Sequence, residues 1–92
     1  MLFRSEAPDS ITVTYCSSRS QNVCSGQCTV YTGGSACLYA PDTQCLGATG
    51  DVAFCSQNNC EGDCNEYNDC GTRLNNGFCY TPDTNSIIVP PS

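Results

Sequence analysis

Val13-Thr-Tyr-Cys-Ser17 recurs at residues 52–56 as Val-Ala-Phe-Cys-Ser. Two further motifs occur twice in the same order: Cys24-Ser-Gly-Gln-Cys28 with Cys60-Glu-Gly-Asp-Cys64, and Cys37-Leu-Tyr-Ala-Pro-Asp-Thr43 with Cys79-Tyr-Thr-Pro-Asp-Thr84. This pattern predicts a tandem duplication, with repeat units at about residues 10–46 and 51–90. A chain of 92 residues has the size of one domain, so we expect both units to form a single domain over residues 1–92.

Ten cysteines in 92 residues are typical of a small extracellular domain stabilised by disulfides. Their even number leaves no thiol over. We therefore expect the protein to be secreted. The residues Met1–Pro8 contain no apolar segment of signal-peptide length, so we expect any secretory signal to have been removed. The cysteines expected in disulfides are Cys16, Cys24, Cys28, Cys37, Cys45, Cys55, Cys60, Cys64, Cys70 and Cys79.

The charge of the chain excludes several partners. Nine acidic residues, three arginines and no lysine give a formal net charge of −6. Binding to nucleic acid or to an anionic membrane is not expected, because the chain has no basic stripe. Membrane insertion is not expected either, because no apolar run approaches the roughly 18 residues that span a bilayer.

The residue types that are missing also restrict the chemistry. The chain has no histidine, which removes the usual general base and the usual Ser or Cys triads. A carboxylate pair could hydrolyse glycosides, but that reaction needs a cleft that a chain of this size seldom encloses. We therefore predict that the protein is not an enzyme.

The cysteine spacing does not match a metal site. Zinc sites favour Cys-x2-Cys, whereas the repeated spacing here is Cys-x3-Cys. The acidic run at 61–69 resembles a calcium loop, but Asn68 and Leu74 stand where that loop requires glycine and glutamate. We predict neither a metal nor another cofactor.

Each unit shows the signals for a strand, a helix and a second strand. Ile11–Tyr15 alternates and is β-branched, which predicts the first strand of one unit, and Val52–Phe54 is its shorter counterpart in the other. The segments 17–28 and 56–67 open with serine, and their Cys-x3-Cys spacing would place both sulfurs of a pair on one helical face. We predict short helices there; the alternative is a disulfide-bound turn in each unit.

The second strands are predicted at 36–39 and 77–80, each ended by a Pro-Asp-Thr turn, and 86–89 is an extra terminal strand. Two βαβ units favour an α+β fold, because right-handed crossovers leave few other arrangements. We therefore expect a disulfide-rich, ferredoxin-like two-layer sandwich with pseudo-twofold symmetry.

Two disulfide patterns fit this topology. The first pairs neighbouring cysteines, as 16–24, 28–37, 55–60 and 64–79; the crossed alternative pairs 16–28 with 24–37, and 55–64 with 60–79. The unmatched Cys45 and Cys70 would form a bridge between the units.

The five tyrosines fall into two groups. Tyr15, Tyr39 and Tyr80 lie beside cysteines in predicted strands, so we expect them in the core. Tyr31 and Tyr67 follow the second cysteine of each Cys-x3-Cys pair by three residues. They are therefore the better candidates for exposed binding contacts.

Arg73 and Leu74 suggest an alternative function. They lie in a loop between Cys70 and Cys79, and a loop held rigid by disulfides docks into a protease cleft at a reduced entropic cost. Arg73 would then occupy an acidic specificity pocket. The sequence thus also allows a proteinase inhibitor that uses Arg73 and Leu74.

An acidic, cysteine-rich chain with two units of strand, Cys-x3-Cys helix and strand resembles the small secreted cysteine-rich proteins of fungi. These include effector-like proteins with a killer-toxin-type α/β sandwich, and the resemblance covers most of the chain. It differs from the defensins, since the Cys-x-Cys strand of that family is absent. The resemblance implies a non-enzymatic role at a host, competitor or cell-wall surface, through binding to an extracellular protein or glycan.

Overall fold

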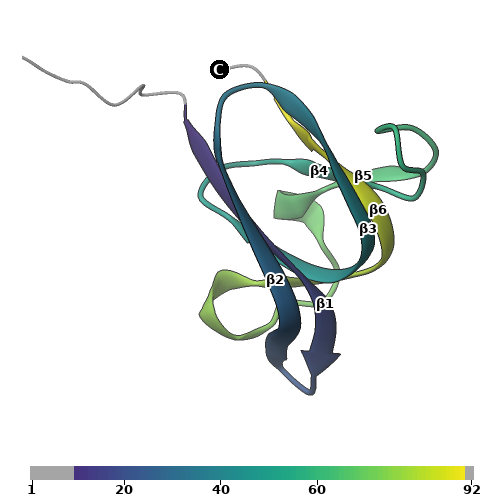
Figure 1. Ribbon diagram of the computed structural model, residues 1–92. Coiled ribbons are helices and arrows are strands. Elements are labelled where there is room, and N and C mark those ends of the chain that lie inside the picture. Colours follow the sequence, from purple (N-terminus) through teal and green to yellow (C-terminus); the bar gives the residue numbers. More distant parts are fainter. Residues whose placement is uncertain (1–9, 91–92) are drawn as a thin grey trace, which may run out of the picture.

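The computed structural model describes residues 10–90, and the predicted absence of a signal segment at Met1–Pro8 lies outside these residues. Six antiparallel strands form one sheet in the order β2-β1-β3-β6-β4-β5 (Figure 1). Two short 3-10 turns precede the last strand. The elements are β1 (Ile11–Ser20), β2 (Val23–Gly33), β3 (Ala36–Ala48), β4 (Ala53–Cys55), β5 (Cys64–Glu66), η1 (Tyr67–Asp69), η2 (Asn75–Gly77) and β6 (Cys79–Val89).

The predicted α+β, ferredoxin-like fold is wrong, because residues 10–90 contain no α-helix. The segment 17–28 belongs to the β1–β2 hairpin, and residues 56–63 form a turn enclosed by the Cys55–Cys64 disulfide. Gly26 and Gly62 have φ angles of +86° and +83°, which a right-handed helix does not allow. The disulfide-bound turn considered as an alternative is thus correct for residues 56–63.

The strands predicted at 11–15 and 36–39 are confirmed, but the Pro-Asp-Thr turns do not end their strands. Of the separate strands predicted at 77–80 and 86–89, residues 79–80 and 86–89 belong to the single strand β6, whereas Gly77 ends η2. Asp42 and Asp83, with φ of +60° and +63°, bend β3 and β6 where their pairing shifts register. Both halves of β3 pair with β6, whereas only the C-terminal half of β3 also pairs with β1 and only that of β6 also pairs with β4.

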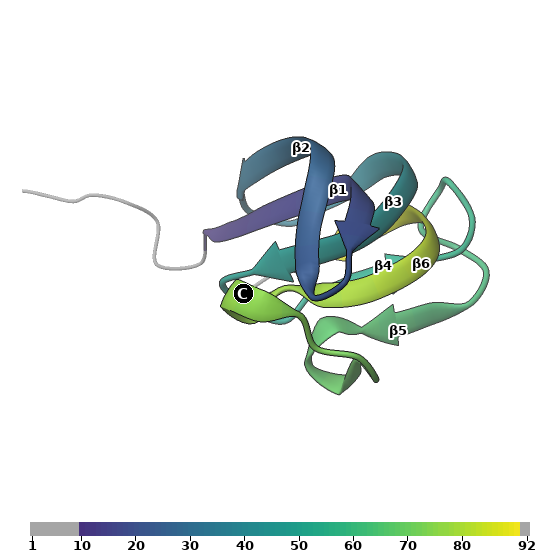
Figure 2. The same cartoon turned by 90° about the horizontal axis from the view of Figure 1, so that it is seen from below.

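The bent sheet encloses a core to which both units contribute. In Figure 2 the β1–β2 hairpin and the β4–β5 pair lie at opposite ends of the sheet, with β3 and β6 between them. A smaller cluster joins Cys16, Cys45 and Leu74. The main core consists of Val13, Ala40, Leu46, Val52, Tyr67, Cys79, Ile87 and Val89.

The two units occupy equivalent positions about a local twofold axis between β3 and β6. Thr43 and Thr84, which are equivalent in the repeat, lie directly opposite each other. Each unit contributes three neighbouring strands, and equivalent strands follow in the same order from either edge of the sheet: β2 or β5, then β1 or β4, then β3 or β6. The pairing also repeats: Tyr15 lies opposite Leu46 and Phe54 opposite Ile87. The duplication seen in the sequence therefore produces an internally symmetric sheet.

All ten cysteines form disulfides, but most of the predicted pairings are wrong. Only 16–28 and 55–64, both from the crossed alternative, are present. The predicted bridge between Cys45 and Cys70 does not form, and the units are instead joined through Cys37 and Cys60. The observed pairs are Cys16–Cys28, Cys24–Cys45, Cys37–Cys60, Cys55–Cys64 and Cys70–Cys79.

A one-residue offset explains why Cys37 and Cys79 are not equivalent. Cys37 stands four residues before Pro41, whereas Cys79 stands three residues before Pro82. Successive residues of a strand point to opposite faces, so the two cysteines face opposite sides of the sheet. Cys79 is buried and bonds to Cys70, whereas Cys37 is exposed and reaches Cys60.

Ser86 explains the second departure from symmetry. It stands two residues after Thr84, as Cys45 stands two residues after Thr43. Cys24 bonds to Cys45 in the first unit, but its counterpart Cys60 only donates a backbone hydrogen bond to Ser86 Oγ, at 2.8 Å. The sulfur of Cys60 therefore bonds to the other unit.

Candidate binding site

Tyr31 and Tyr67, the predicted exposed contacts, lie at equivalent positions but not on a shared surface. Tyr67 is 8% exposed, and its hydroxyl donates a hydrogen bond to the carbonyl of Gly77. Tyr31 is half-buried against the core, and its hydroxyl donates to the carbonyl of Gly34 at 2.8 Å. Tyr67 therefore packs inside the domain, and only the edge of Tyr31 is available to a partner.

Leu74 is not presented to solvent as a protease-binding loop requires, and the exposed Arg73 is held by contacts within the domain. Leu74 is buried in the smaller cluster. The guanidinium of Arg73 lies 4.8 Å from the centre of the Tyr67 ring, and Nη2 donates to the carbonyls of Tyr67 and Asn68 at 3.0 and 3.2 Å. Arg73 would have to break these contacts to enter a specificity pocket.

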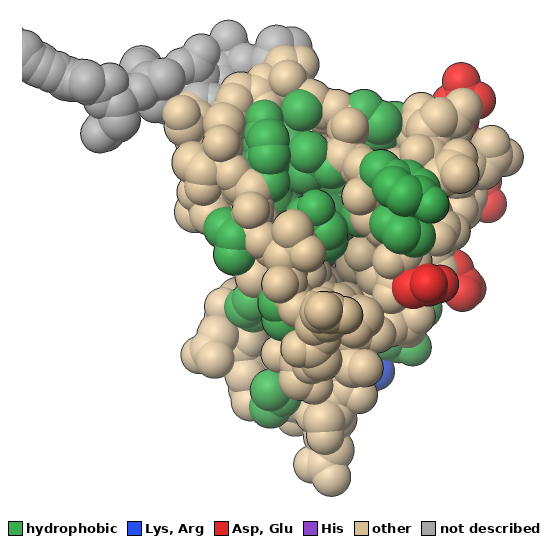
Figure 3. Space-filling model, viewed as in Figure 1, with side chains coloured by type: hydrophobic (Ala, Val, Ile, Leu, Met, Phe, Trp, Pro, Cys, Tyr) green, Lys and Arg blue, Asp and Glu red, His purple; other side chains and the backbone are tan. Residues whose placement is uncertain are grey.

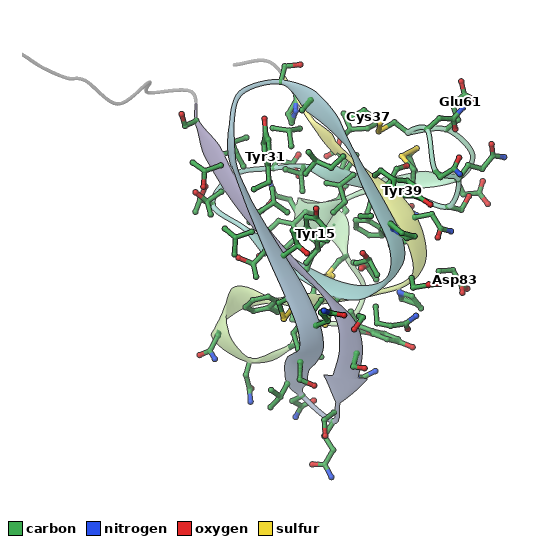
Figure 4. All side chains as sticks on the ribbon, in the orientation of Figure 1. Tyr15, Tyr31, Cys37, Tyr39, Glu61 and Asp83 are labelled. Atoms are coloured by element: carbon green, nitrogen blue, oxygen red, sulfur yellow. A yellow bond between two sulfur atoms is a disulfide. The ribbon has the colours of Figure 1, made fainter. Side chains whose placement is uncertain are left out.

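A groove of about 330 Å³ lies beside the Cys16–Cys28 disulfide, and we call it the first groove. Tyr39 stands at its edge and is 65% exposed, so the prediction that Tyr39 lies in the core is wrong. Tyr15 and Tyr39, which both line this groove, are labelled in Figure 4. The groove is lined by Tyr15, Cys16, Ser17, Gln27, Cys28, Thr29, Tyr39, Ala40, Pro41 and Thr43.

A second groove, of about 230 Å³, lies beside the Cys55–Cys64 disulfide. It is the counterpart of the first groove, because nearly all of its lining residues are repeat equivalents of residues that line the first. The two units therefore build the same kind of groove. The equivalent residues are Tyr15 and Phe54, Ser17 and Ser56, Gln27 and Asp63, Thr29 and Asn65, Pro41 and Pro82, and Thr43 and Thr84.

One wall of each groove is a serine-supported turn. Ser17 Oγ accepts the backbone N–H of Gln27 at 3.1 Å, and Ser56 Oγ accepts that of Asp63 at 3.0 Å. The preceding residue is glycine in both units, and a Cβ at Gly26 would lie 2.7 Å from the Cβ of Ser18. The close packing and the positive φ thus require glycine at this point of the wall.

The other wall of each groove is the bend in β3 or β6. Thr43 Oγ1 donates to the carbonyl of Ala40 at 2.9 Å, and Thr84 Oγ1 donates to that of Thr81 at 2.8 Å. Both threonines are buried, so these bonds hold each proline in a fixed position at the rim. The repeated Pro-Asp-Thr motif predicts a turn in each unit but does not predict this wall.

A middle hollow of about 400 Å³ connects the two grooves. It shares Tyr39 and Pro41 with the first groove and Ser56 with the second. Its other lining residues are the amides Gln57, Asn58 and Asn85. We call the first groove, the middle hollow and the second groove together the polar track.

Asn85 fixes the middle hollow at its base. Its Nδ2 donates to the carbonyl of Ser56 at 2.7 Å, and its Oδ1 accepts the N–H of Asp42 at 3.3 Å. The amide thus holds the turn of residues 56–63 beside the bend of β3.

Among residues 10–90, the polar track is lined by hydroxyl, amide and aromatic groups and by no cation. Within that range its only charged lining residues are Asp63 and Asp83, both in the second groove. Figure 3 shows acidic side chains along one margin of this face, with a basic side chain below them and mostly uncharged side chains over the rest. Such a surface suits ligands that donate hydrogen bonds and disfavours anions.

A separate acidic group lies on β5 and its surroundings. The pKa of Glu66 is raised because the charge of Asp51 lies near it, with a smaller contribution from Asp69. Across residues 10–90, no group of three or more histidines, cysteines or acids is placed to hold a metal ion. Within the same part of the chain, no helix is long and apolar enough to cross a membrane.

Comparison with protein-family models, with curated proteins and with solved structures finds no match to this chain.

Proposed function

We propose that this protein is a secreted, non-enzymatic binding module, effector-like in character, that acts outside the cell on a protein or a glycan. The observation that carries the proposal is the polar track, an exposed surface whose two grooves are built from repeated motifs. Five disulfides support an extracellular setting, in which such bonds persist. The composition and internal repeats that resemble those of fungal effector-like proteins support the same role.

The construction of the track favours recognition. Its walls are held by the Cys16–Cys28 and Cys55–Cys64 disulfides, which cross between paired strands. A rigid surface loses little conformational entropy when it binds, so more of the contact energy appears as affinity. Tyr39 is exposed where the first groove meets the middle hollow. Tyrosine is frequent among the few residues that contribute most of the binding energy of an interface.

The test is capture from extracellular fluid with the immobilised protein and two matched variants. Tyr39→Ala removes the ring on the track, whereas Val30→Ala removes a side chain of similar exposure, 62% against 65%, on the edge strand β2. We expect wild type and Val30→Ala to retain the same molecule, and Tyr39→Ala and the reduced, alkylated protein to lose it. Equal capture by all four forms, or capture by none, would refute the proposed function.

A further inference from the structure

We infer that the polar track binds one extended segment of a neutral, hydroxyl-rich polysaccharide, with consecutive sugar units in the first groove, the middle hollow and the second groove. The inference rests on the proposed function and names the ligand class of that same surface. It follows from three properties of the track: its continuity, its repeated chemistry and its charge.

Continuity favours a long ligand over a compact one. Tyr39 and Pro41 line both the first groove and the middle hollow, and Ser56 lines both the middle hollow and the second groove. A chain molecule can therefore contact both grooves through the middle hollow. The three hollows are small, at about 330, 400 and 230 Å³, so the affinity for a chain molecule accumulates over several units.

The repeated chemistry favours a ligand that is itself repetitive. Each groove places an aromatic ring, from Tyr15 or Phe54, near a serine and a proline. The apolar C–H face of a sugar ring packs on such side chains, while its hydroxyls bond to neighbouring polar groups. Two equivalent grooves offer this combination twice, as a chain of similar sugar units requires.

Charge selects a neutral chain over an anionic one. The middle hollow is lined by three uncharged amide side chains, Gln57, Asn58 and Asn85, which both donate and accept hydrogen bonds. The second groove adds the carboxylates of Asp63 and Asp83, which accept hydrogen bonds from hydroxyl groups. With no basic side chain on the track and a formal net charge of −6, a polyanion would be repelled.

The test uses calorimetry with a set of soluble neutral polysaccharides, an anionic polysaccharide as control, and oligomers of increasing length from any neutral chain that binds. We expect affinity to rise with length until the oligomer spans the track, and the anionic chain not to bind. Tyr39→Ala should weaken binding roughly tenfold, the loss typical of an aromatic residue at the centre of a binding surface. Val30→Ala, with a similarly exposed side chain outside the track, should not change it.

Asn65→Ala tests whether the second groove takes part, with Asn22→Ala as its control, because both asparagines are exposed and only Asn65 lines the track. We expect Asn65→Ala to weaken the binding of long oligomers and Asn22→Ala to leave it unchanged. Affinity that does not depend on oligomer length, or equal binding of long oligomers by Asn65→Ala and Asn22→Ala, would overturn the inference. So would failure of every neutral polysaccharide while Tyr39-dependent capture of a protein persists, an outcome that leaves the proposed function standing.

Discussion

Replacing Gly26 with alanine should destabilise the whole domain. Gly26 has φ of +86°, and an L-residue in left-handed backbone costs about 1–2 kcal/mol. The new Cβ would also lie 2.7 Å from the Cβ of Ser18, an atom attached directly to the backbone of β1, so relief requires a backbone shift of about 1–3 kcal/mol. Together these costs predict a loss of about 3 kcal/mol in the free energy of unfolding, or roughly 12–24 °C in melting temperature for a domain of this size.

Thermal unfolding followed by circular dichroism measures this loss, with the disulfides kept oxidised. Gly34→Ala is the matched control, because no atom lies within 4 Å of its added Cβ and its φ is not in the positive region. The free energy of unfolding of that variant should be unchanged or should rise by up to about 1 kcal/mol. If Gly26→Ala, Gly34→Ala and wild type have the same melting temperature, the close approach of Gly26 to Ser18 in the serine-supported turn is refuted.

Three other changes test separate parts of the structure. Thr81→Val should raise the free energy of unfolding by about 1 kcal/mol, because the buried Thr81 hydroxyl has no hydrogen-bond partner among residues 10–90; a lower melting temperature would contradict this. Replacing Cys37 and Cys60 together by serine removes a bridge that spans 23 residues. The free energy of unfolding measured by chemical denaturation should fall by about 3 kcal/mol, while amide exchange stays slow in the β1–β2 and β4–β5 hairpins. Because the folded-state pKa of Glu66 is raised, chiefly by Asp51, its contribution to stability is largest in acid and falls as the pH rises through that pKa. Glu66→Gln should therefore be more stable than wild type near pH 7, and the difference should disappear near pH 3, below the ordinary pKa of glutamate.

The sequence predicted the strands better than the fold. Ile11–Tyr15 alternates between apolar residues and threonine, its first four residues are β-branched, and it forms the start of β1, as expected. The Cys-x3-Cys spacing misled the prediction, because a pair of cysteines four residues apart fits either a helical face or two places on a strand and its adjoining turn. Cys16 lies directly opposite Cys28 in the β1–β2 pairing, a contact that depends on register between strands. Local sequence does not contain that information.

Most residues of the polar track were not predicted from the sequence, because the fold brings them together from separate segments. Tyr39 lies beside two core positions in the sequence, and its neighbours Leu38 and Ala40 are indeed half-buried and buried. Period-two alternation alone would have placed Tyr39 on the opposite face from both, so the signal was present. Gln57 and Asn58 carried no such signal, because the fold, not the local sequence, brings their turn to the middle hollow.

The departure from perfect repetition also shapes the polar track. If both units had the same spacing before proline, Cys37 would point towards the core as Leu38 does, and Cys60 would lack its partner. The offset instead directs Cys37 outward, two residues from Tyr39, and its bond to Cys60 ties the turn of residues 56–63 to β3. That turn supplies the amides of the middle hollow. The same disulfide that joins the two units therefore places the Gln57 and Asn58 side chains beside Tyr39, so the surface that links the two grooves depends on the point at which the repeats differ.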